Sequence, residues 1–409
     1  MKRVVITGMA GISTLGNTPE EMLASLRTGK NATKFIAEWQ EYHGLRSYLY
    51  AKMDGYETPK YLTRKNLRTM STLSVMAVDA TRRSLEDAGL LDDPILQTSQ
   101  TGVAYGSCVG SVREFAACHA MVYEKSAREL NSGTYVKMMG HTAAVNISLY
   151  FGTKGRIINS STACTSGSLA IGQAYESIAM GRQTVMLAGG AELFNVLQTA
   201  VFDTLFAAST RNDSPERTPA PYDAARDGLV LGEGACTLVL EELEHALARG
   251  AHIYAEVVGF GFCSDGLHIT SPNAQTMKGA MVEALEVAKL RPSDIDYISL
   301  HGTGTINGDK AEAEATRSVF TEPVPASSLK SYTGHTLGAC GALESMVSIL
   351  MMHEGWFHPN LNLRELDPDC AGLDLITGEG RSIEAECVMN NNYAFGGINT
   401  SLIFRKWKN

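Results

Sequence analysis

Short apolar runs alternate along the chain with amphipathic stretches of helical period, which is the pattern of strands followed by helices. The apolar runs predict strands over these ranges: Val4–Thr7, Thr101–Gly106, Gly155–Ser160, Thr184–Ala188, Ala235–Glu241, Ile253–Gly259, Ile295–Leu300, Cys387–Asn391 and Thr400–Arg405. The amphipathic stretches predict helices over these: Pro19–Thr28, Leu67–Ala88, Ser166–Met180, Met277–Ala288, Lys310–Phe320 and Ala339–Met352. This alternation predicts an α/β fold in which helices cover mixed sheets.

Local signals refine two of these elements. Asn17 or Thr18 is a suitable N-cap for the helix that begins at Pro19, because a short polar side chain can accept a hydrogen bond from the first turn. The neighbouring runs Ala235–Glu241 and Ile253–Gly259 predict two strands that pair with each other.

Each half of the chain delivers one reactive side chain just after a strand. The strand that ends at Ser160 leads to Cys164, and the strand that ends at Leu300 leads to His301. This correspondence predicts a duplicated architecture within one compact body. A seam near Arg249–Tyr254 divides it into an N-terminal half, 1–252, and a C-terminal half, 253–409.

Composition and charge narrow the function classes. The 409 residues are 44% hydrophobic and 19% charged, as in ordinary globular proteins, and the net charge of -9 disfavours non-specific nucleic-acid binding. No apolar stretch approaches the ~20 residues of a membrane helix, so we expect a soluble, cytoplasmic protein without membrane insertion. The 8 cysteines form no C-x-x-C pair, so we expect reduced thiols and no metal site.

Cys164 has the strongest local signal for chemistry. It follows a strand and the small residues 161–163, and it precedes a helix rich in alanine, glycine and serine. Small neighbours give a thioester access to the sulfur, and a helix N-terminus favours the thiolate, which is the reactive form. A single cysteine of this kind is more often a buried structural residue, so the prediction depends on partners elsewhere.

Two histidines in glycine-rich turns supply such partners. His301 precedes a Gly-Thr-Gly-Thr run, and His335 lies between Gly334 and a small-residue helix. Imidazoles donate hydrogen bonds and transfer protons near neutral pH. A further glycine turn, Gly396–Gly397, carries Phe395; taken alone it is an ordinary turn with a packed aromatic ring.

Taken together, these turns resemble the elongating β-ketoacyl-acyl carrier protein synthases of the thiolase superfamily over nearly the whole chain. The matching stretches, in the family's order and approximate spacing, are Val4–Gly16, Thr162–Gly167, Ser209–Asp213, Tyr222–Glu233, His301–Glu312, Lys330–Gly341 and Phe395–Asn399. The resemblance implies two fused α/β halves in a layered α-β-α-β-α core of thiolase-like type. It also implies a dimer.

The resemblance implies an acyltransferase in which Cys164 accepts the acyl group and His301 and His335 form the decarboxylation site. The product is a β-ketoacyl chain, made by decarboxylative Claisen condensation with malonyl-acyl carrier protein in type II fatty acid or related polyketide or polyene biosynthesis. The backbone N–H groups of Cys164 and Phe395 form the implied oxyanion hole, and Phe395 also gates the site. No cofactor is implied, because the substrates arrive on the phosphopantetheine of the carrier.

Supporting roles follow from the same resemblance. Lys330 is a polar residue beside the histidines, Asp309 and Glu312 help to hold the histidine loop, and Glu344 is structural.

Other positions are implied to meet the substrate. Thr303 and Thr305 would bind the phosphopantetheine arm, with Thr270 near its entrance, and Val109 and Phe202 would line the acyl tunnel. Since Val109 is smaller than the isoleucine usual there, a longer or unusual acyl group is expected.

A basic cluster is the expected docking site for an acidic carrier protein. Lys65, Arg68, Arg128 and Arg211 are its candidate members, although such clusters are usually solvated helix faces. Phe206 stands where relatives are often basic, which points to a different choice of carrier.

Some positions depart from the family pattern, and some alternatives stay open. Tyr393 and Ala394 replace a usual Phe-Gly pair, and Ile398 replaces a usual threonine, so the gate or pocket shape is expected to differ. Cys340 is interpreted as packing, not as the second cysteine of a degradative thiolase. The chain acts either as a homodimer or as a subunit that is active only in a heterodimer with a chain-length-factor-like partner.

Overall fold

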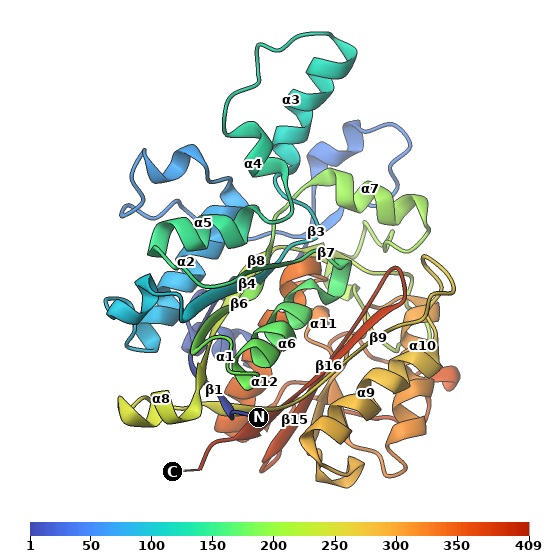
Figure 1. Ribbon diagram of the computed structural model, residues 1–409. Coiled ribbons are helices and arrows are strands. Elements are labelled where there is room, and N and C mark those ends of the chain that lie inside the picture. The colour runs from blue at the N-terminus through green and yellow to red at the C-terminus, as the bar shows by residue number, and fades with distance from the viewer. Residues whose placement is uncertain (409) are drawn as a thin grey trace.

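An eleven-stranded mixed sheet runs through the computed structural model, which describes residues 1–408 (Figure 1). The strand order is β13-β11-β10-β15-β16-β9-β1-β8-β6-β4-β5. The strands of its N-terminal half are β1 (Val4–Ser13), β4 (Thr101–Gly106), β5 (Ile157–Ser160), β6 (Val185–Glu192) and β8 (Gly234–Glu242). Those of its C-terminal half are β9 (Ala255–Ser264), β10 (Tyr297–Ser299), β11 (Pro325–Ser327), β13 (Asp374–Leu375), β15 (Cys387–Ala394) and β16 (Ile398–Lys406). Two small sheets contain β2 (Thr33–Phe35), β3 (Leu49–Ala51) and β7 (Leu231–Gly232), and β12 (Trp356–Phe357) and β14 (Arg381–Ser382).

The same strand order occurs in both halves of the large sheet. If the main strands are numbered along each half, β5-β4-β6-β8-β1 and β11-β10-β15-β16-β9 both read 3-2-4-5-1. In each half the last strand, β8 or β16, is antiparallel to both of its neighbours. The duplicated α/β architecture expected from the sequence is therefore present. The expected border at 252/253 falls between the end of α8 (Leu243–Ala248) and the start of β9.

Helices form three layers around the two half-sheets (Figure 1). α6 (Ser166–Ala179) and α12 (Cys340–Glu354) contact strands of both halves and so make the central layer. α2 (Thr72–Asp87) and α5 (Thr142–Phe151) cover the outer face of the N-terminal half, and α9 (Ala274–Ala288) and α10 (Ile306–Val319) lie beyond the C-terminal half. The remaining helices are α1 (Pro19–Arg27), α3 (Val112–Tyr123), α4 (Thr134–Met138), α7 (Val196–Thr204) and α11 (Lys330–Thr333). The central layer places the starts of α6 and α12 side by side.

Two sequence-based expectations about these elements are wrong. β8 and β9 do not pair with each other, because β1 lies between them and pairs antiparallel with both. The long helix expected from Leu67 begins only at Thr72: residues 66–68 form a separate 3₁₀ turn, and Ser71 caps α2. The cap of α1 is Thr18, whose hydroxyl accepts the N–H of Glu21 at 3.2 Å.

Two further properties concern the cysteines and the helices. Each of the eight cysteines is a free thiol. Within residues 1–408, none of the helices combines the length and the apolar character that a membrane crossing needs.

Candidate active site

Cys164 lies in a tight turn between β5 and α6. Ala163, directly before it, has φ of 52°, a left-handed conformation that a residue with a Cβ rarely adopts. Leu337, two residues after His335, has φ of 46°. Strained residues of this kind persist where the surrounding structure holds them, and they concentrate at functional sites. The turn that carries Cys164 and the turn that carries His335 thus each contain one residue in an unusual backbone conformation.

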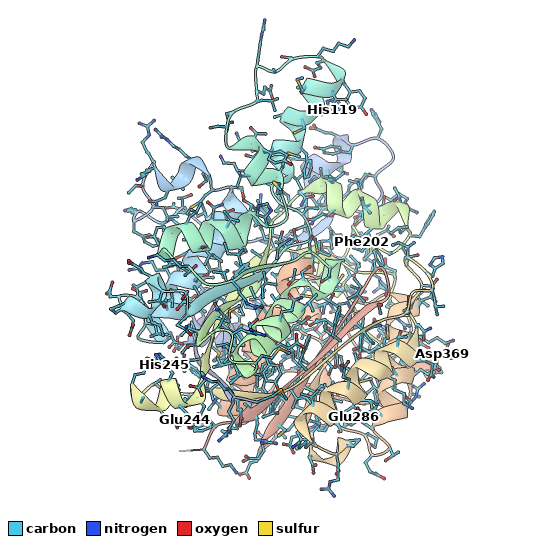
Figure 2. All side chains as sticks on the ribbon, in the orientation of Figure 1. His119, Phe202, Glu244, His245, Glu286 and Asp369 are labelled. Carbon is cyan, nitrogen blue, oxygen red and sulfur yellow. The ribbon has the colours of Figure 1, made fainter. Side chains whose placement is uncertain are left out.

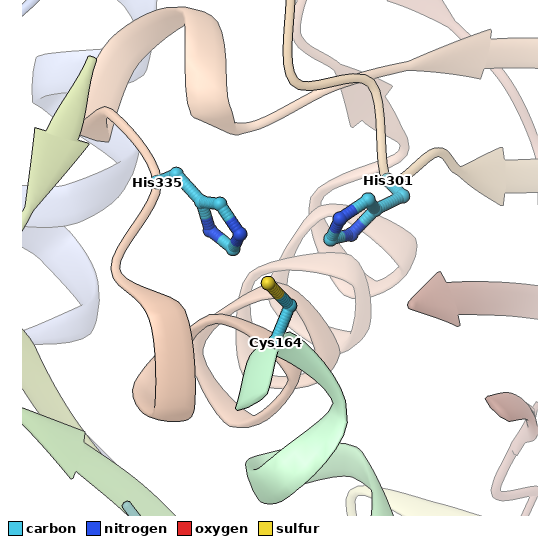
Figure 3. Close-up of side chains that lie close together, drawn as sticks. All are labelled: Cys164, His301 and His335. Atoms are coloured by element: carbon cyan, nitrogen blue, oxygen red, sulfur yellow. The ribbon is translucent and has the colours of Figure 1, made fainter. Parts of the chain in front are cut away.

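The sulfur and the two imidazoles converge at the junction of the two halves (Figure 3). Cys164 Sγ and one ring nitrogen from each of His301 and His335 all lie within 4.8 Å of one another. The two rings are perpendicular, with centroids 5.2 Å apart and an interplanar angle of 87°. Figure 3 shows the sulfur facing the gap between the rings. The first half thus supplies the thiol and the second half both imidazoles; the same three donors could also hold a metal ion.

Hydrogen bonds leave ring nitrogens of both histidines available. The N–H of Leu337 donates to His335 Nδ1 at 3.2 Å, so the proton of the neutral ring resides on Nε2. His335 Nε2 and His301 Nδ1 are buried and have no hydrogen-bond partner among residues 1–408. Buried polar atoms are normally paired, so these two nitrogens are suited to meet a ligand.

Burial sets the protonation of all three groups. It lowers the pKa of His301 and of His335 well below 6.5, and the charge of Lys330 lowers both further, so the rings are neutral at pH 7. Burial also raises the pKa of Cys164 to about 12, although Lys330 and the residue's own N–H oppose this. In the free protein, burial therefore opposes the readily formed thiolate that the sequence argument expects.

A buried ion pair, Lys330 with Glu344, acts on both histidines. Lys330 Nζ lies 2.5 Å from Glu344 Oε1, and both side chains are 1% exposed. The other oxygen of Glu344 accepts a hydrogen bond from Asn392 at 2.7 Å. Burial alone would lower the pKa of Lys330, but Glu344 raises it, so the ammonium keeps its charge. Lys330 therefore supplies a fixed positive field at both imidazoles.

Two carboxylates hold the turn that follows β10. Glu312 accepts the backbone N–H groups of residues 301 and 302 and the Tyr222 hydroxyl, each at 2.7 Å. Asp309 accepts those of residues 303 and 304 at 3.0 and 3.1 Å, and Arg226 Nε lies 3.3 Å from it. Four consecutive N–H groups are thus fixed by two side chains of α10, which sets the position of the His301 ring.

A cavity of about 350 Å³ opens over the cysteine and both histidines. The sequence-predicted residues that line it are Phe202, Thr270, Thr303, Thr305 and Phe395. Phe202, labelled on α7 in Figure 2, packs against the ring of Phe395 with centroids 5.3 Å apart. Val109, in the loop between β4 and α3, does not belong to this lining.

The turn after β15 depends on two glycines. Gly396 and Gly397 have φ of 83° and 68°, and a Cβ at Gly397 would lie 2.0 Å from a carboxylate oxygen of Asp265. The N–H of Gly396 donates to the carbonyl of Ile269 at 2.7 Å. This contact ties the Phe395 turn to the segment that carries Thr270.

The basic docking candidates differ in availability. Lys65, Arg68 and Arg128 are exposed. Arg211 is half-buried, lies 3.4 Å from Asp227, and donates to the Ala225 carbonyl, so its guanidinium is engaged within its own loop.

Sequence reasoning missed Glu192, a buried residue beneath the site. Its carboxylate accepts the N–H groups of Cys108 and Gly338 at 2.9 and 3.1 Å, and the amide of Gln198 at 3.1 Å. Burial raises its pKa to about 7. It links the loop after β4 to the loop after His335. The only sequence signal was an acidic residue at the end of an apolar strand.

Comparisons with known proteins agree over the full length. Residues 1–246 match the model for the N-terminal domain of β-ketoacyl synthases, and residues 254–364 match that for the C-terminal domain. The chain is 38% identical over 411 residues to 3-oxoacyl-[acyl-carrier-protein] synthase 1 of Escherichia coli, with 100% of each covered. It is 55% identical to a β-ketoacyl synthase of known crystal structure from Burkholderia phymatum (TM-score 0.98), and 31% to the ishigamide ketosynthase/chain length factor (TM-score 0.92), again with 100% of each chain covered.

Proposed function

This chain belongs to the β-ketoacyl synthase family, and we propose that it joins an acyl group held on Cys164 to malonyl-acyl carrier protein by decarboxylative Claisen condensation. It is an acyltransferase of the condensing type. The observation that carries the assignment of residues is the convergence of one thiol with two neutral imidazoles, each with an unpartnered nitrogen.

The first step is acyl transfer to the enzyme. Cys164 loses its proton, the sulfur attacks the thioester carbonyl of the acyl-carrier, and the carrier thiol leaves with a proton. Because the Cys164 pKa is raised to about 12, the proton must be removed as the sulfur attacks. His301 is the suitable acceptor, since Nδ1 of His335 already accepts the Leu337 N–H and its Nε2 carries a proton. The backbone N–H groups of Cys164 and Phe395 would stabilise the tetrahedral oxyanion, at about 3 kcal/mol for one such donor.

The second step forms the carbon–carbon bond. The thioester oxygen of malonyl-carrier lies between His301 and His335. It accepts a hydrogen bond from the N–H group of each ring. When the carboxylate leaves as CO₂, its electron pair passes into the enolate, whose oxygen both rings stabilise. The enolate carbon then attacks the acyl-Cys164 carbonyl, and the thiolate leaves to give the β-ketoacyl product. Neutral rings suit this role because they donate hydrogen bonds without requiring an acidic medium.

The cavity walls divide between the two substrates. Phe202 and Phe395 form the apolar contact beside Cys164, where an acyl chain would enter, and Phe395 sits on the glycine turn that would let it move. Thr303 and Thr305, whose hydroxyls lie 2.9 Å apart, would bind the phosphopantetheine arm with Thr270. Val109 lies in the loop between β4 and α3, outside the cavity lining.

Acyl carrier protein is the proposed macromolecular substrate, docking through the exposed Lys65, Arg68 and Arg128. Reversing the first two charges (Lys65→Glu with Arg68→Glu) should raise KM for acyl-carrier about tenfold or more, since carriers are acidic, and leave kcat nearly unchanged. Arg291→Glu is the matched control, because Arg291 is exposed and precedes β10 at the end away from His301. An equal KM in the double variant and the wild type would remove the docking assignment.

A second subunit is proposed to cover β5. This strand pairs only with β4, at the edge of the large sheet, and Ile157 on it and Leu149 on α5 are 47% and 66% exposed. An open edge with apolar neighbours favours pairing with another chain. The partner is either a second copy or a related subunit, as in the ishigamide ketosynthase/chain length factor.

Purification of this chain alone separates these possibilities and tests the function. We expect a dimer of the single chain that converts acyl- and malonyl-carrier to a β-ketoacyl product, measured by mass spectrometry of the carrier. A chain that gains condensation activity only when a partner synthase-like subunit is added would favour the heterodimer. The absence of product under both conditions would contradict the proposed function.

A further inference from the structure

Tyr393 is a buried residue of the cavity that the reaction described above does not use. It lines the cavity with Cys164, His301 and His335, and it is 5% exposed. Its ring meets the ring of His301 nearly edge-on, with centroids 5.9 Å apart and an angle of 71°. Its hydroxyl is buried and has no hydrogen-bond partner within residues 1–408. An unpaired buried hydroxyl is costly, so its presence here requires an explanation.

Tyr393 lies on the His301 side of the cavity. Tyr393 packs in the apolar cluster that contains Met277 and Leu300, under α9 and next to His301. Cys164 and Phe202 belong to a different cluster, on the side of the acyl chain. Because Tyr393 lies against His301, the proposed extender, whose thioester oxygen would lie between the histidines, is the substrate nearest to it.

The extender brings a charge that the cavity does not otherwise match. A malonyl group carries a carboxylate two carbons from its thioester carbonyl. Among the described residues that line the cavity there is no lysine or arginine, and the acidic member is Asp227. The carboxylate must still exchange its hydration for protein donors, since an unpaired buried charge is strongly disfavoured.

A neutral donor fits this requirement. Burial raises the pKa of Tyr393 well above 10, so the phenol keeps its proton at any working pH. One hydrogen bond can fix the carboxylate, whereas a buried cation would stabilise it too strongly before CO₂ departs. Only interactions that survive into the transition state speed the reaction, so modest ground-state binding is preferable here.

We propose that the Tyr393 hydroxyl donates a hydrogen bond to the carboxylate of the malonyl group and so selects a carboxylated extender. This inference rests on the proposed function, because it needs malonyl-carrier as a substrate. Tyr393 is a binding residue of the second step and has no part in acyl transfer to Cys164.

The test removes the hydroxyl and little else, with Tyr393→Phe. KM for malonyl-carrier should rise about tenfold, the size expected for one lost hydrogen bond to a charged group, while kcat changes far less. The rate of Cys164 acylation by acyl-carrier should stay at the wild-type value. Tyr332→Phe is the matched control: Tyr332 is also buried, meets a histidine ring edge-on and has an unpartnered hydroxyl, but it does not line the cavity.

Direct binding separates failure of this inference from failure of the proposed function. The ratio of the Kd values for acetyl-carrier and malonyl-carrier should fall about tenfold in Tyr393→Phe, because only the malonyl group has the carboxylate. An unchanged ratio, or slower acylation of Cys164 with an unchanged malonyl KM, would overturn the inference. A wild-type protein that makes no β-ketoacyl product would overturn the proposed function, and the binding ratio would still report on the contact.

Discussion

Cys164→Ala is expected to abolish condensation, with a fall in kcat on the order of 10⁴-fold or more, because loss of a covalent nucleophile removes the whole acyl-enzyme route. The exchange removes one sulfur from a buried position in a tight turn, so the fold should persist. Both imidazoles remain, so the variant should still release CO₂ from malonyl-carrier. The measurement is product formation and CO₂ release, assayed separately on the same preparation.

A second buried cysteine provides the control for this variant. Cys236 lies in the core, where its thiol donates to the Ala342 carbonyl at 3.4 Å, and it does not line the cavity. Cys236→Ala should therefore condense at close to the wild-type rate. Comparable activity in Cys164→Ala and Cys236→Ala would contradict the assignment of the nucleophile.

Glu344→Ala is expected to destabilise the protein by about 3–5 kcal/mol, because it leaves the Lys330 ammonium buried without its counter-charge. Asn392 also loses an acceptor at 2.7 Å. Lys330 must then either stay charged at a high desolvation cost or lose its proton, which removes the field that lowers the imidazole pKa values. Denaturant unfolding gives the stability, and condensation should fall along with it.

A double variant separates stability from chemistry at this pair. Lys330→Met with Glu344→Leu removes both charges together, so most of the lost stability should return, as is usual when a buried pair is replaced by apolar groups. Condensation should stay low, since Lys330 no longer acts on His301 and His335. Wild-type activity in the stable double variant would show that the pair is only structural.

Much of the fold was predictable because the buried residues of many helices and strands follow the periodicity of those elements in the sequence. β4 has the bounds expected from its apolar run, and α6 and α9 differ from expectation only at one end. The helices from α3 to α5 and α7 were not predicted. In α5 and α7 the polar and apolar residues follow no clear stripe. Exposed residues such as Tyr123 on α3 and Leu197 on α7 blur the helical period.

The strand pairing could not be predicted from neighbouring runs. β8 and β9 are consecutive strands in the sequence, joined by α8. In the sheet, however, β1 lies between them. β1 is buried along all of its residues, and such a strand can pair on both edges. Its run of apolar residues does not indicate which strands are its partners.

The site divides in the same way. A small-residue turn indicated Cys164 and glycine-rich turns indicated His301 and His335, and the structure brings these residues together. Sequence did not give the pKa of Cys164, because helix position suggests a lower value and only burial reveals the larger opposing effect. It also missed Glu192, whose three acceptor contacts come from distant segments.

Mass spectrometry of the intact protein after exposure to acyl-carrier shows whether Cys164 is the nucleophile. We expect a mass gain of one acyl group, located on the peptide that contains Cys164 and discharged as β-ketoacyl product when malonyl-carrier is added. An acyl group found on another residue, or condensation without any acyl-Cys164, would contradict this assignment.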